Sequence, residues 1–329
     1  MRTRTTFIPV ALAVALAAGL TGCAAPDETP KTPAAATQSG AATGQINTSP
    51  EQNRIVPAKV DAAAALVPDA IRKTGKLVIG LGLAGSGSPP LGFTATDNNT
   101  VIGNEPDLGV AVAGILGLEP ELQNTSWENL FIGLDSGKFN VGASNITVTE
   151  ERKQKYDFVT YRLDNLAFEA KKGSGWKVTG PKDVAGKKVA VSSGTNQEKI
   201  LVEWSKQAVA DGLPAVDIKY YQTNQATQLA LGSGQIDLYL GPNPTSAYRV
   251  AVSGETEIVG TYSGAGADLQ GKIALTTKKD NVLVKALKAA LDELIKSGDY
   301  AKILARWNLG NEAVETAEVN PPGLPIEGK

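Results

Sequence analysis

Histidine is absent from this 329-residue chain, and cysteine occurs once, at Cys23. Without histidine the chain cannot build a Ser-His or Cys-His nucleophile pair, a histidine general base or a histidine metal site. One cysteine allows neither an intrachain disulfide nor a cysteine metal cluster. A G-x-S-x-G elbow and a Gly-Lys-Ser/Thr phosphate loop are missing as well. These absences argue against the common hydrolases, and we predict no metal and no cofactor.

Positive charge is not in excess either. Lysine and arginine number 32 against 34 aspartates and glutamates, which gives a formal net charge of −2. Because acids and bases are interspersed, no basic surface is expected and nucleic acid is not a predicted partner. With 42% hydrophobic residues, the chain is long enough for one large or two medium domains.

The first residues have the pattern of an export signal. Arg2 and Arg4 precede an apolar run over 7–20, and the tetrapeptide Leu-Thr-Gly-Cys ends at Cys23. The run is shorter than the ~20 residues of a membrane-spanning helix, so a cleaved signal peptide is predicted over 1–22. The tetrapeptide is similar to a bacterial lipobox, which implies lipid attachment to Cys23. A plain signal peptide with an unrelated cysteine is the alternative.

Residues 23–57 consist mainly of Ala, Thr, Pro, Ser, Gln and Gly, with almost no large apolar side chain. Such a segment buries too little apolar surface to become ordered, and we predict a flexible tether. With acyl chains on Cys23, the tether would hold a folded domain on the extracytoplasmic face of the cell membrane.

Strand and helix patterns then alternate in two blocks, which predicts an α/β fold. The expected strands cover 76–80, 139–143, 188–191, 235–240, 256–261 and 272–276. The expected helices include 58–73, 103–118, one that Ser126 caps, one that Thr195-x-x-Glu198 opens as a capping box, 282–295 and 300–307.

Gly80-x-Gly82-x-x-Gly85 matches the dinucleotide-binding fingerprint literally. That fingerprint requires a helix to open at the third glycine. Pro89 and Pro90 follow instead, and they do not allow that helix to start. We therefore interpret these glycines as part of a loop that lines a cleft.

An internal echo relates the two blocks. L-D-S-G-K-F-N-V from Leu134 and L-G-S-G-Q-I-D-L from Leu231 both read as a helix end, a Ser-Gly stop and an apolar strand, at an offset of 97 residues (231 − 134). The echo supports two lobes of similar build. Ligands bind beyond the carboxyl ends of strands in open α/β sheets, so Asn145 and Pro242, at equivalent strand ends, are expected to face a cleft between the lobes.

The stretch S-N-I-T-V-T-E-E-R, from Ser144 to Arg152, follows one of these strands. Backbone amides, small hydroxyl and amide side chains and one guanidinium are suited to receive a small carboxylate. A surface arginine in the first turn of a helix is the alternative reading.

The segment 76–310 resembles the family 3 extracellular solute-binding proteins, the amino-acid receptors of bacterial ABC importers. The motifs that carry the resemblance are Ile102-Gly103-x-x-x-Asp107-Leu108, Trp127-x-x-Leu130, Ser136-Gly137-Lys138-Phe139, Thr147-Val148-Thr149-Glu150-Glu151-Arg152, Tyr156-Asp157-Phe158, Gly194-Thr195 and Tyr300-Ala301-Lys302-Ile303-Leu304-x-x-Trp307.

The resemblance implies a two-lobe, periplasmic-binding-protein-like fold of type II, in which two hinge strands join the lobes and let them close around a ligand. The implied boundaries are 58–168 and 275–312 for lobe 1, 169–274 for lobe 2, 313–329 for a C-terminal tail, and crossings near 167–170 and 273–276. The implied protein is a monomer that binds a small carboxylate-bearing solute, an amino acid or a derivative, and works with the permease subunits of an ABC importer.

Carried over by position, the resemblance implies a ligand-binding set. Arg152 and the Thr147 amide would hold the ligand carboxylate, and Ser144 and Asn145 would contact its polar head. Thr195 and Asn196 would meet the carboxylate from the N-terminus of a helix in lobe 2. Trp127 would stack on the rest of the ligand, unless it is ordinary core. Asn243, which follows Pro242 at the end of a predicted lobe 2 strand, is the last residue of the predicted ligand-binding set.

The chain departs from the family pattern where an aspartate usually binds the ligand ammonium, because Pro242 stands there. With little negative charge expected in the cleft loops, a strongly basic ligand is disfavoured. An enzyme on the same fold, similar to a dehydratase, is the alternative function. It would need Glu105 or Asp107 as a general acid or base.

Overall fold

A computed structural model describes residues 45–83, 85, 87–221 and 223–326 of the chain. The predicted signal peptide, Cys23 and the predicted tether up to residue 44 lie outside these residues. Within the described part, no helix combines the length and the apolar character needed to cross a membrane.

Lobe 1 is built on a sheet whose central strand is β1 (Lys76–Gly82). This strand pairs in parallel with β5 (Glu119–Thr125) and with β6 (Val141–Gly142). The helices of this lobe are α1 (Asp61–Ala64), α2 (Asp69–Thr74), α3 (Asn104–Leu116), α4 (Trp127–Ser136), α9 (Leu283–Ser297) and α10 (Asp299–Arg306). The single helix predicted over 58–73 is wrong, because Pro68 separates α1 from α2.

A small antiparallel sheet follows β1. It contains β2 (Gly87–Ser88), β3 (Gly92–Thr94) and β4 (Val101–Ile102). No helix therefore opens at Gly85, and the next helix after β1 begins only at Asn104. Because β1 extends through Gly82, only Gly85 of the three glycines lies in a turn, and the interpretation of Gly80 and Gly82 as loop residues is wrong.

Lobe 2 repeats the parallel pattern. Its strands β8 (Lys188–Val191), β9 (Asp217–Tyr220) and β10 (Leu238–Pro242) are joined in the order β10-β8-β9. The helices of this lobe are α5 (Pro181–Val184), α6 (Asn196–Ala210), α7 (Asn224–Ser233) and α8 (Asn243–Ser253). The lobe has its own hydrophobic cluster around Phe168, Leu201 and Leu238.

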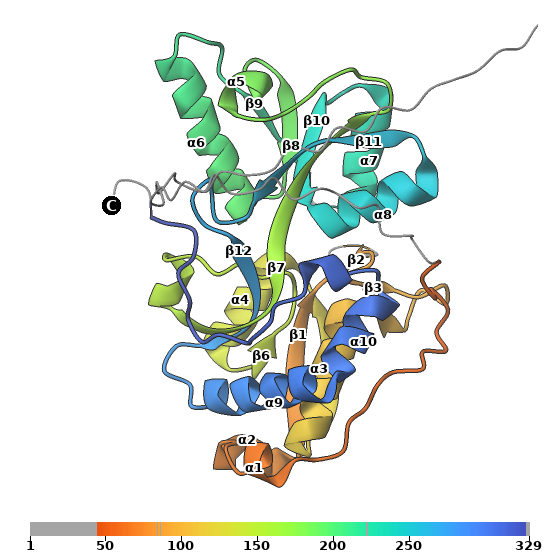
Figure 1. The fold of residues 1–329 in the computed structure, drawn as a ribbon, viewed down its shortest axis with the longest axis vertical. Coiled ribbons are helices and arrows are strands. Elements are labelled where there is room, and N and C mark those ends of the chain that lie inside the picture. The colour runs from red at the N-terminus through yellow and green to blue at the C-terminus, as the bar shows by residue number, and fades with distance from the viewer. Residues whose placement is uncertain (1–44, 84, 86, 222, 327–329) are drawn as a thin grey trace, which may run out of the picture. The chain divides into compact units, whose positions relative to one another are not determined.

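Two segments connect the lobes. One is the strand β7 (Tyr156–Lys171), which Figure 1 shows running from one lobe into the other, and the second is the chain over 264–270, between two further strands. Up to Asp164, β7 pairs with β12 (Gly271–Lys278), and from Asn165 on it pairs with β11 (Thr256–Ser263). The two-lobe α/β fold predicted from the sequence is confirmed. The crossing on β7 lies a few residues before the predicted 167–170, and 273–276 lies inside the pairing of β12 with the lobe 1 half of β7.

The internal sequence echo corresponds to a structural unit that occurs in both lobes. Helices α4 and α7 both end at a left-handed glycine, Gly137 and Gly234. The side chain of Asn140 accepts a hydrogen bond of 2.8 Å from the Val78 amide, and the side chain of Asp237 accepts one of 2.8 Å from the Lys188 amide. Each lobe thus uses the same helix–glycine–strand unit, fastened to its neighbouring strand in the same way.

Both ends of the described chain pack against the lobes. Ile46 is buried in the lobe 1 core, and the Arg54 guanidinium donates to the Asp107 carboxylate at 2.9 Å. The predicted tether therefore does not extend through residues 45–57, which dock on lobe 1. In the predicted tail, Ala317 is buried, and Val319 forms a bridge with Val159 on β7.

Candidate functional site

A cavity of about 370 Å³ lies between the two lobes. Lobe 1 lines it with the loop after β1, the N-terminus of α4 and the residues after β6. Lobe 2 lines it with the N-termini of α6 and α7 and the end of β10. Its volume falls in the range of about 300–1,000 Å³ that small-molecule sites occupy.

Five of the eight predicted ligand-binding residues line this cavity: Trp127, Ser144, Asn145, Thr195 and Asn196. Asn145 and Pro242, which the echo places at equivalent strand ends, both lie on the cavity wall. Asn243 instead lines a second cavity of about 460 Å³, together with residues of the chain's N- and C-terminal segments. The reason is that Asn243 begins α8, and the chain has already turned away from the first cavity there.

Arg152 and Thr147 lie beside the cavity and do not line it. The Arg152 guanidinium donates to the Thr147 carbonyl at 3.0 Å and to the Gly194 carbonyl of lobe 2 at 3.1 Å. Its carbon lies 5.3 Å from the centre of the Trp127 ring, which is close enough for a cation–π contact. The Thr147 hydroxyl is buried and donates to Asp164 at 2.7 Å.

The charge of Arg152 is not paired with a carboxylate among the described residues. Both of its hydrogen-bond acceptors are neutral carbonyls, and burial lowers its pKa to about 10. The side chain therefore remains cationic at neutral pH. A desolvated cation without a counter-ion is costly, and a ligand carboxylate would remove that cost.

Trp127 both lines the cavity and contacts this arginine. The ring is half-buried, lines the cavity and packs edge-on against Phe131 at 5.0 Å between centroids. Its position is therefore compatible with both readings of the sequence, and a ligand contact for Trp127 stays a prediction.

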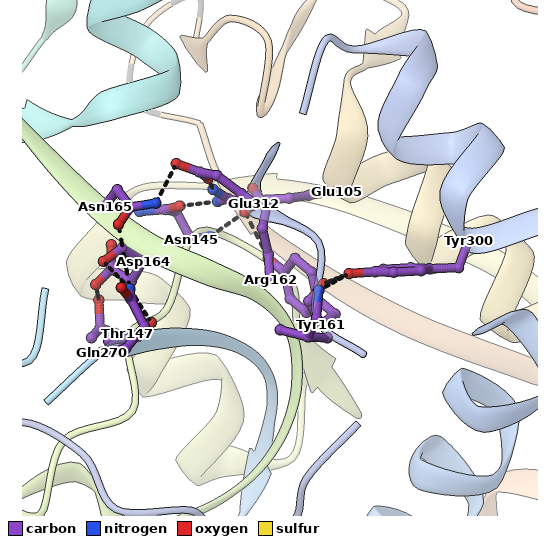
Figure 2. Close-up of polar contacts among 12 residues, drawn as sticks. Glu105, Asn145, Thr147, Tyr161, Arg162, Asp164, Asn165, Gln270, Tyr300 and Glu312 are labelled. Carbon is purple, nitrogen blue, oxygen red and sulfur yellow. Dashed lines mark hydrogen bonds and ion pairs between the residues drawn. The ribbon is translucent and has the colours of Figure 1, made fainter. Parts of the chain in front are cut away.

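Glu105, at the start of α3, is a cavity residue that sequence reasoning assigned to an ordinary helix. It is 2% exposed, and one of its carboxylate oxygens accepts hydrogen bonds from the Asn145 amide and, at 2.8 Å, from the Tyr161 hydroxyl (Figure 2). It forms no ion pair among the described residues. Burial raises its pKa, although the nearby Arg162 charge opposes that rise.

A buried network lies behind this carboxylate. Arg162 pairs with Glu312 and also donates to the side chain of Asn145, so the residue on the cavity wall is held from behind (Figure 2). Asn145 has a left-handed backbone with φ of 48°, a conformation that asparagine tolerates better than most residues. The sequence pointed to Glu105 only as a candidate acid or base of an enzyme, and its place on the cavity wall was not predicted.

Asp107, the other acid considered for an enzyme, is committed to the lobe 1 core. It is buried and accepts from Arg54 at 2.9 Å, Arg306 at 3.0 Å and the Trp307 indole at 2.9 Å. Its carboxylate ties the N-terminal segment to α10 and does not line the cavity.

The lobe 2 wall is made of neutral groups. Thr195 caps α6: its hydroxyl accepts from the Glu198 amide at 3.2 Å and donates to the Ser192 carbonyl at 2.7 Å. The Asn196 amide group donates across to Asp164 at 3.1 Å. The first amides of the 15-residue helix α6 thus lie at the cavity, where an anionic group is favoured.

The two lobes touch at both ends of the cavity. At one end Arg152 bonds to Gly194, and Lys199 forms an ion pair with Glu151. At the other end the Asn224 side chain donates to the Gly87 carbonyl at 2.9 Å and to the Ser88 hydroxyl at 2.7 Å. Contacts of this kind can exist only while the lobes are together, so they favour a closed arrangement.

A metal site finds no support in the part of the chain that the structure describes, because no three potential ligands among Asp, Glu, His and Cys come together there.

Comparisons with known proteins agree with this geometry. The sequence profile of "Bacterial extracellular solute-binding proteins, family 3" matches residues 81–311. The arginine-binding protein ArgT of Corynebacterium glutamicum is 30% identical over 82% of this chain and 86% of its own length. The L-cystine-binding protein TcyJ of Escherichia coli is 30% identical over 72% of this chain and 84% of its own. Among solved structures, a P235GK mutant of ArgBP from T. maritima has a TM-score of 0.62 and 25% identity over 75% of this chain and 99% of that one.

Proposed function

Because this chain belongs to the bacterial extracellular solute-binding proteins of family 3, we propose that it captures an amino acid for an ABC importer. The solute enters the cavity between the lobes and is held when they close. The protein acts as a monomer on the extracytoplasmic side and passes the solute to the permease subunits. The relatives named as arginine- and cystine-binding proteins support an amino acid as the ligand.

The single observation that carries this proposal is the unpaired, half-buried Arg152 at the junction of the lobes. A ligand carboxylate can form an ion pair with the guanidinium. The helix N-terminus at Thr195 and Asn196 lies on the lobe 2 side of the cavity. Such a ligand binds both lobes at once and therefore stabilises the closed arrangement.

We further propose that the ligand carries a positive charge, as L-arginine does. The charged residues on the cavity wall are Glu105 and Glu128, and no lysine or arginine of the described chain joins them there. A basic ligand was disfavoured because the cleft loops offer little negative charge, but α3 contributes the Glu105 carboxyl group to the cavity wall. A buried carboxylate gains most from a cationic partner.

An enzyme on this fold remains the alternative function. Asp107 is tied into the core, so Glu105, with its raised pKa, would be the general acid or base. Incubation of the protein with each ligand that binds, followed by mass spectrometry of the small molecule, separates the two functions. A receptor returns the ligand unchanged, whereas an enzyme gives a product that disappears in Glu105→Gln.

Isothermal titration calorimetry tests the carboxylate site. The mature chain, with Cys23→Ser, is titrated with L-arginine, L-ornithine, L-glutamine and L-cystine, and with agmatine, which is arginine without its carboxylate. Loss of one partner of a desolvated charge pair costs about 2–5 kcal/mol, so Arg152→Ala should weaken L-arginine binding by about 30-fold or more.

The melting temperature of ligand-free Arg152→Ala should stay close to that of the wild type, because the side chain has no ion pair to lose. Lys155→Ala, an exposed cation three residues further on, is the matched control and should bind as the wild type does. Unchanged binding by Arg152→Ala would place the carboxylate elsewhere, and equal binding of agmatine would do the same.

The lipid anchor is tested separately, because Cys23 lies outside the described residues. Cys23→Ser, expressed with its signal peptide in a bacterium that processes lipoproteins, should move from the membrane fraction to the soluble fraction. Retention of this variant in the membrane would contradict the anchor without affecting the ligand proposal.

A further inference from the structure

The segment after the family match, residues 313–326, runs along β7 and is named here the C-terminal strap. Sequence predicted a tail for this region. The Thr160 amide donates to the Glu318 carbonyl at 2.9 Å, and the Asn320 side chain accepts from the Phe158 amide at 2.9 Å. Pro321 and Gly323 are buried. Residues 318–320 of the strap therefore pair with β7, and the rest of the strap continues beyond this strand.

The far end of the strap is bonded to the loop that carries Arg152. The Leu324 amide donates to the Val148 carbonyl at 3.1 Å, and the Glu150 amide donates to the Leu324 carbonyl at 2.9 Å. The Gly323 amide donates to the Glu150 side chain at 2.9 Å. Three hydrogen bonds thus fix the backbone of the loop just before Arg152.

The same loop determines where the arginine lies. The Arg152 amide donates to the Thr149 hydroxyl at 3.1 Å, and its guanidinium donates to the Thr147 carbonyl. Thr149 itself forms a parallel bridge with Leu324. A displacement of residues 148–150 would therefore move the Thr149 hydroxyl, which accepts the hydrogen bond from the Arg152 amide.

Leu324 also links this loop to lobe 2. Its side chain is partly buried and packs against the lobe 2 hydrophobic cluster that contains Phe168, Leu201 and Leu238. The backbone of Leu324 thus pairs with lobe 1 while its side chain packs on lobe 2. Such a residue supports the arrangement in which the lobes are together.

Gly323 shows how tightly the strap fits. A Cβ atom at this position would lie 2.4 Å from the Val148 carbonyl oxygen and 2.9 Å from the Thr149 amide nitrogen, both of which are backbone atoms. Backbone cannot rotate away as a flexible side chain can, so any side chain at 323 must push the strap and the loop apart.

We propose that the C-terminal strap is a positioning element for ligand binding: Gly323 and Leu324 hold the Thr147–Arg152 loop in its binding geometry before the ligand arrives. The proposal rests on the proposed function of Arg152 as the carboxylate partner. A loop that is already ordered does not lose its conformational freedom on binding, and affinity gains accordingly.

The test compares Gly323→Ala with Gly310→Ala, a glycine in the same C-terminal region with nothing within 4 Å of an added Cβ. Gly323→Ala should weaken L-arginine binding about tenfold, the scale of one or two lost hydrogen bonds. Hydrogen–deuterium exchange should show faster exchange in peptides that cover 147–152, where the Glu150 amide loses its acceptor. Gly310→Ala should match the wild type in both measurements.

Leu324→Ala is the second variant, because it removes the side chain contact with lobe 2 and leaves both backbone hydrogen bonds in place. It should weaken binding with little change in exchange at Glu150, and it decides the matter if Gly323→Ala does not fold. Wild-type binding by Gly323→Ala and Leu324→Ala, with unchanged exchange over 147–152, would overturn the strap proposal. A wild type that binds no amino acid contradicts the proposed function instead, and exchange still reports whether the strap holds the loop.

Discussion

The two lobes share a helix–glycine–strand unit but present different chemistry to the cavity. In lobe 1 the strand leads to Ser144 and Asn145, with Glu105 behind them. In lobe 2 the equivalent strand ends at Gly241 and Pro242, which carry no charge. The repeated backbone therefore shapes the cavity, while the residues that replace one another at the strand ends divide its chemical roles.

Buried ion pairs sharpen this contrast. In lobe 2, Arg249 donates to both carboxylate oxygens of Glu169, at 3.0 and 3.1 Å from its Nε, and Thr256 donates to the same carboxylate at 2.7 Å. Those charges are satisfied within the lobe. In lobe 1, Glu105 and Arg152 each lack an oppositely charged partner among the described residues. Under the proposed function, lobe 1 would therefore supply the charged contacts to the ligand, and lobe 2 would close over it with neutral donors.

Of the variants considered, Glu105→Gln should have the largest effect on ligand binding, because it removes the carboxylate of lobe 1 that is unpaired among the described residues. The glutamine keeps an oxygen for the Asn145 amide and the Tyr161 hydroxyl but removes the charge. Because about 2–5 kcal/mol is lost when a desolvated charge pair is broken, calorimetry should show L-arginine binding at least about 30-fold weaker. L-Glutamine, with no side-chain charge, should lose much less. Glu128→Gln, at the exposed rim of the cavity, is the control and should change affinity little.

Lowering the pH should have the next largest effect on the affinity for L-arginine. Burial raises the pKa of Glu105 above its ordinary 4.5, and a cationic ligand requires the ionised form. Affinity for L-arginine should therefore fall as the pH drops through that raised pKa, by up to about tenfold per pH unit. The nearby Asp164 and Glu312 also have raised pKa values. Calorimetry from pH 8 to pH 4.5 should thus be steeper for the wild type than for Glu105→Gln, and parallel profiles would exclude Glu105.

Pro242→Asp should make lobe 2 more like lobe 1. A carboxylate at this half-buried strand end can meet the α-ammonium of a ligand. The preference for L-arginine over 5-guanidinopentanoate, which lacks that ammonium, should rise about tenfold, or about 1.4 kcal/mol. Pro242→Asn has a similar shape without the charge and should leave the preference unchanged. An equal gain in both variants would point to backbone effects of the lost proline.

Asn224→Ala should have the smallest effect, because it removes neutral hydrogen bonds between the lobes. Its two bonds to Gly87 and Ser88 are worth about 0.5–1.5 kcal/mol each. Because Asn224 is only half-buried and water can replace its bonds, we take the lower end of that range, about 1 kcal/mol for the two bonds together, so affinity should fall about fivefold with an unchanged melting temperature of the ligand-free protein. Gln228→Ala, exposed one turn later on α7, should behave as the wild type. A lower melting temperature with normal affinity would mean that the contact stabilises the fold and not closure.

Much of the site could be read from local sequence because its parts are contiguous. Ser144 and Asn145 follow a strand within a few residues, and the capping box at Thr195 specifies its own helix end. The helix stop at Gly137 and its counterpart at Gly234 follow from the need for a left-handed residue. Patterns of this kind depend on neighbours in the chain, so the sequence specifies them directly.

The remainder depends on contacts between distant residues. Glu105 faces the cavity because α3 packs beside Tyr161, 56 positions away. The position of the hinge depends on where β7 changes its pairing partner from β12 to β11. The motif spacing of the family did not predict that position. The loop before Arg152 is hydrogen-bonded to Gly323, which lies 173 positions after Glu150 in the chain.

By itself, the sequence of this protein determined two α/β lobes, their shared unit and a strand end suited to a carboxylate. The tertiary structure alone decided that the cavity contains a buried carboxyl group and that the C-terminal segment is hydrogen-bonded to the loop before Arg152. The physical reason is that helix caps, turns and strand periodicity are set by neighbouring residues, whereas burial and pairing of charges depend on the packing of segments far apart in sequence.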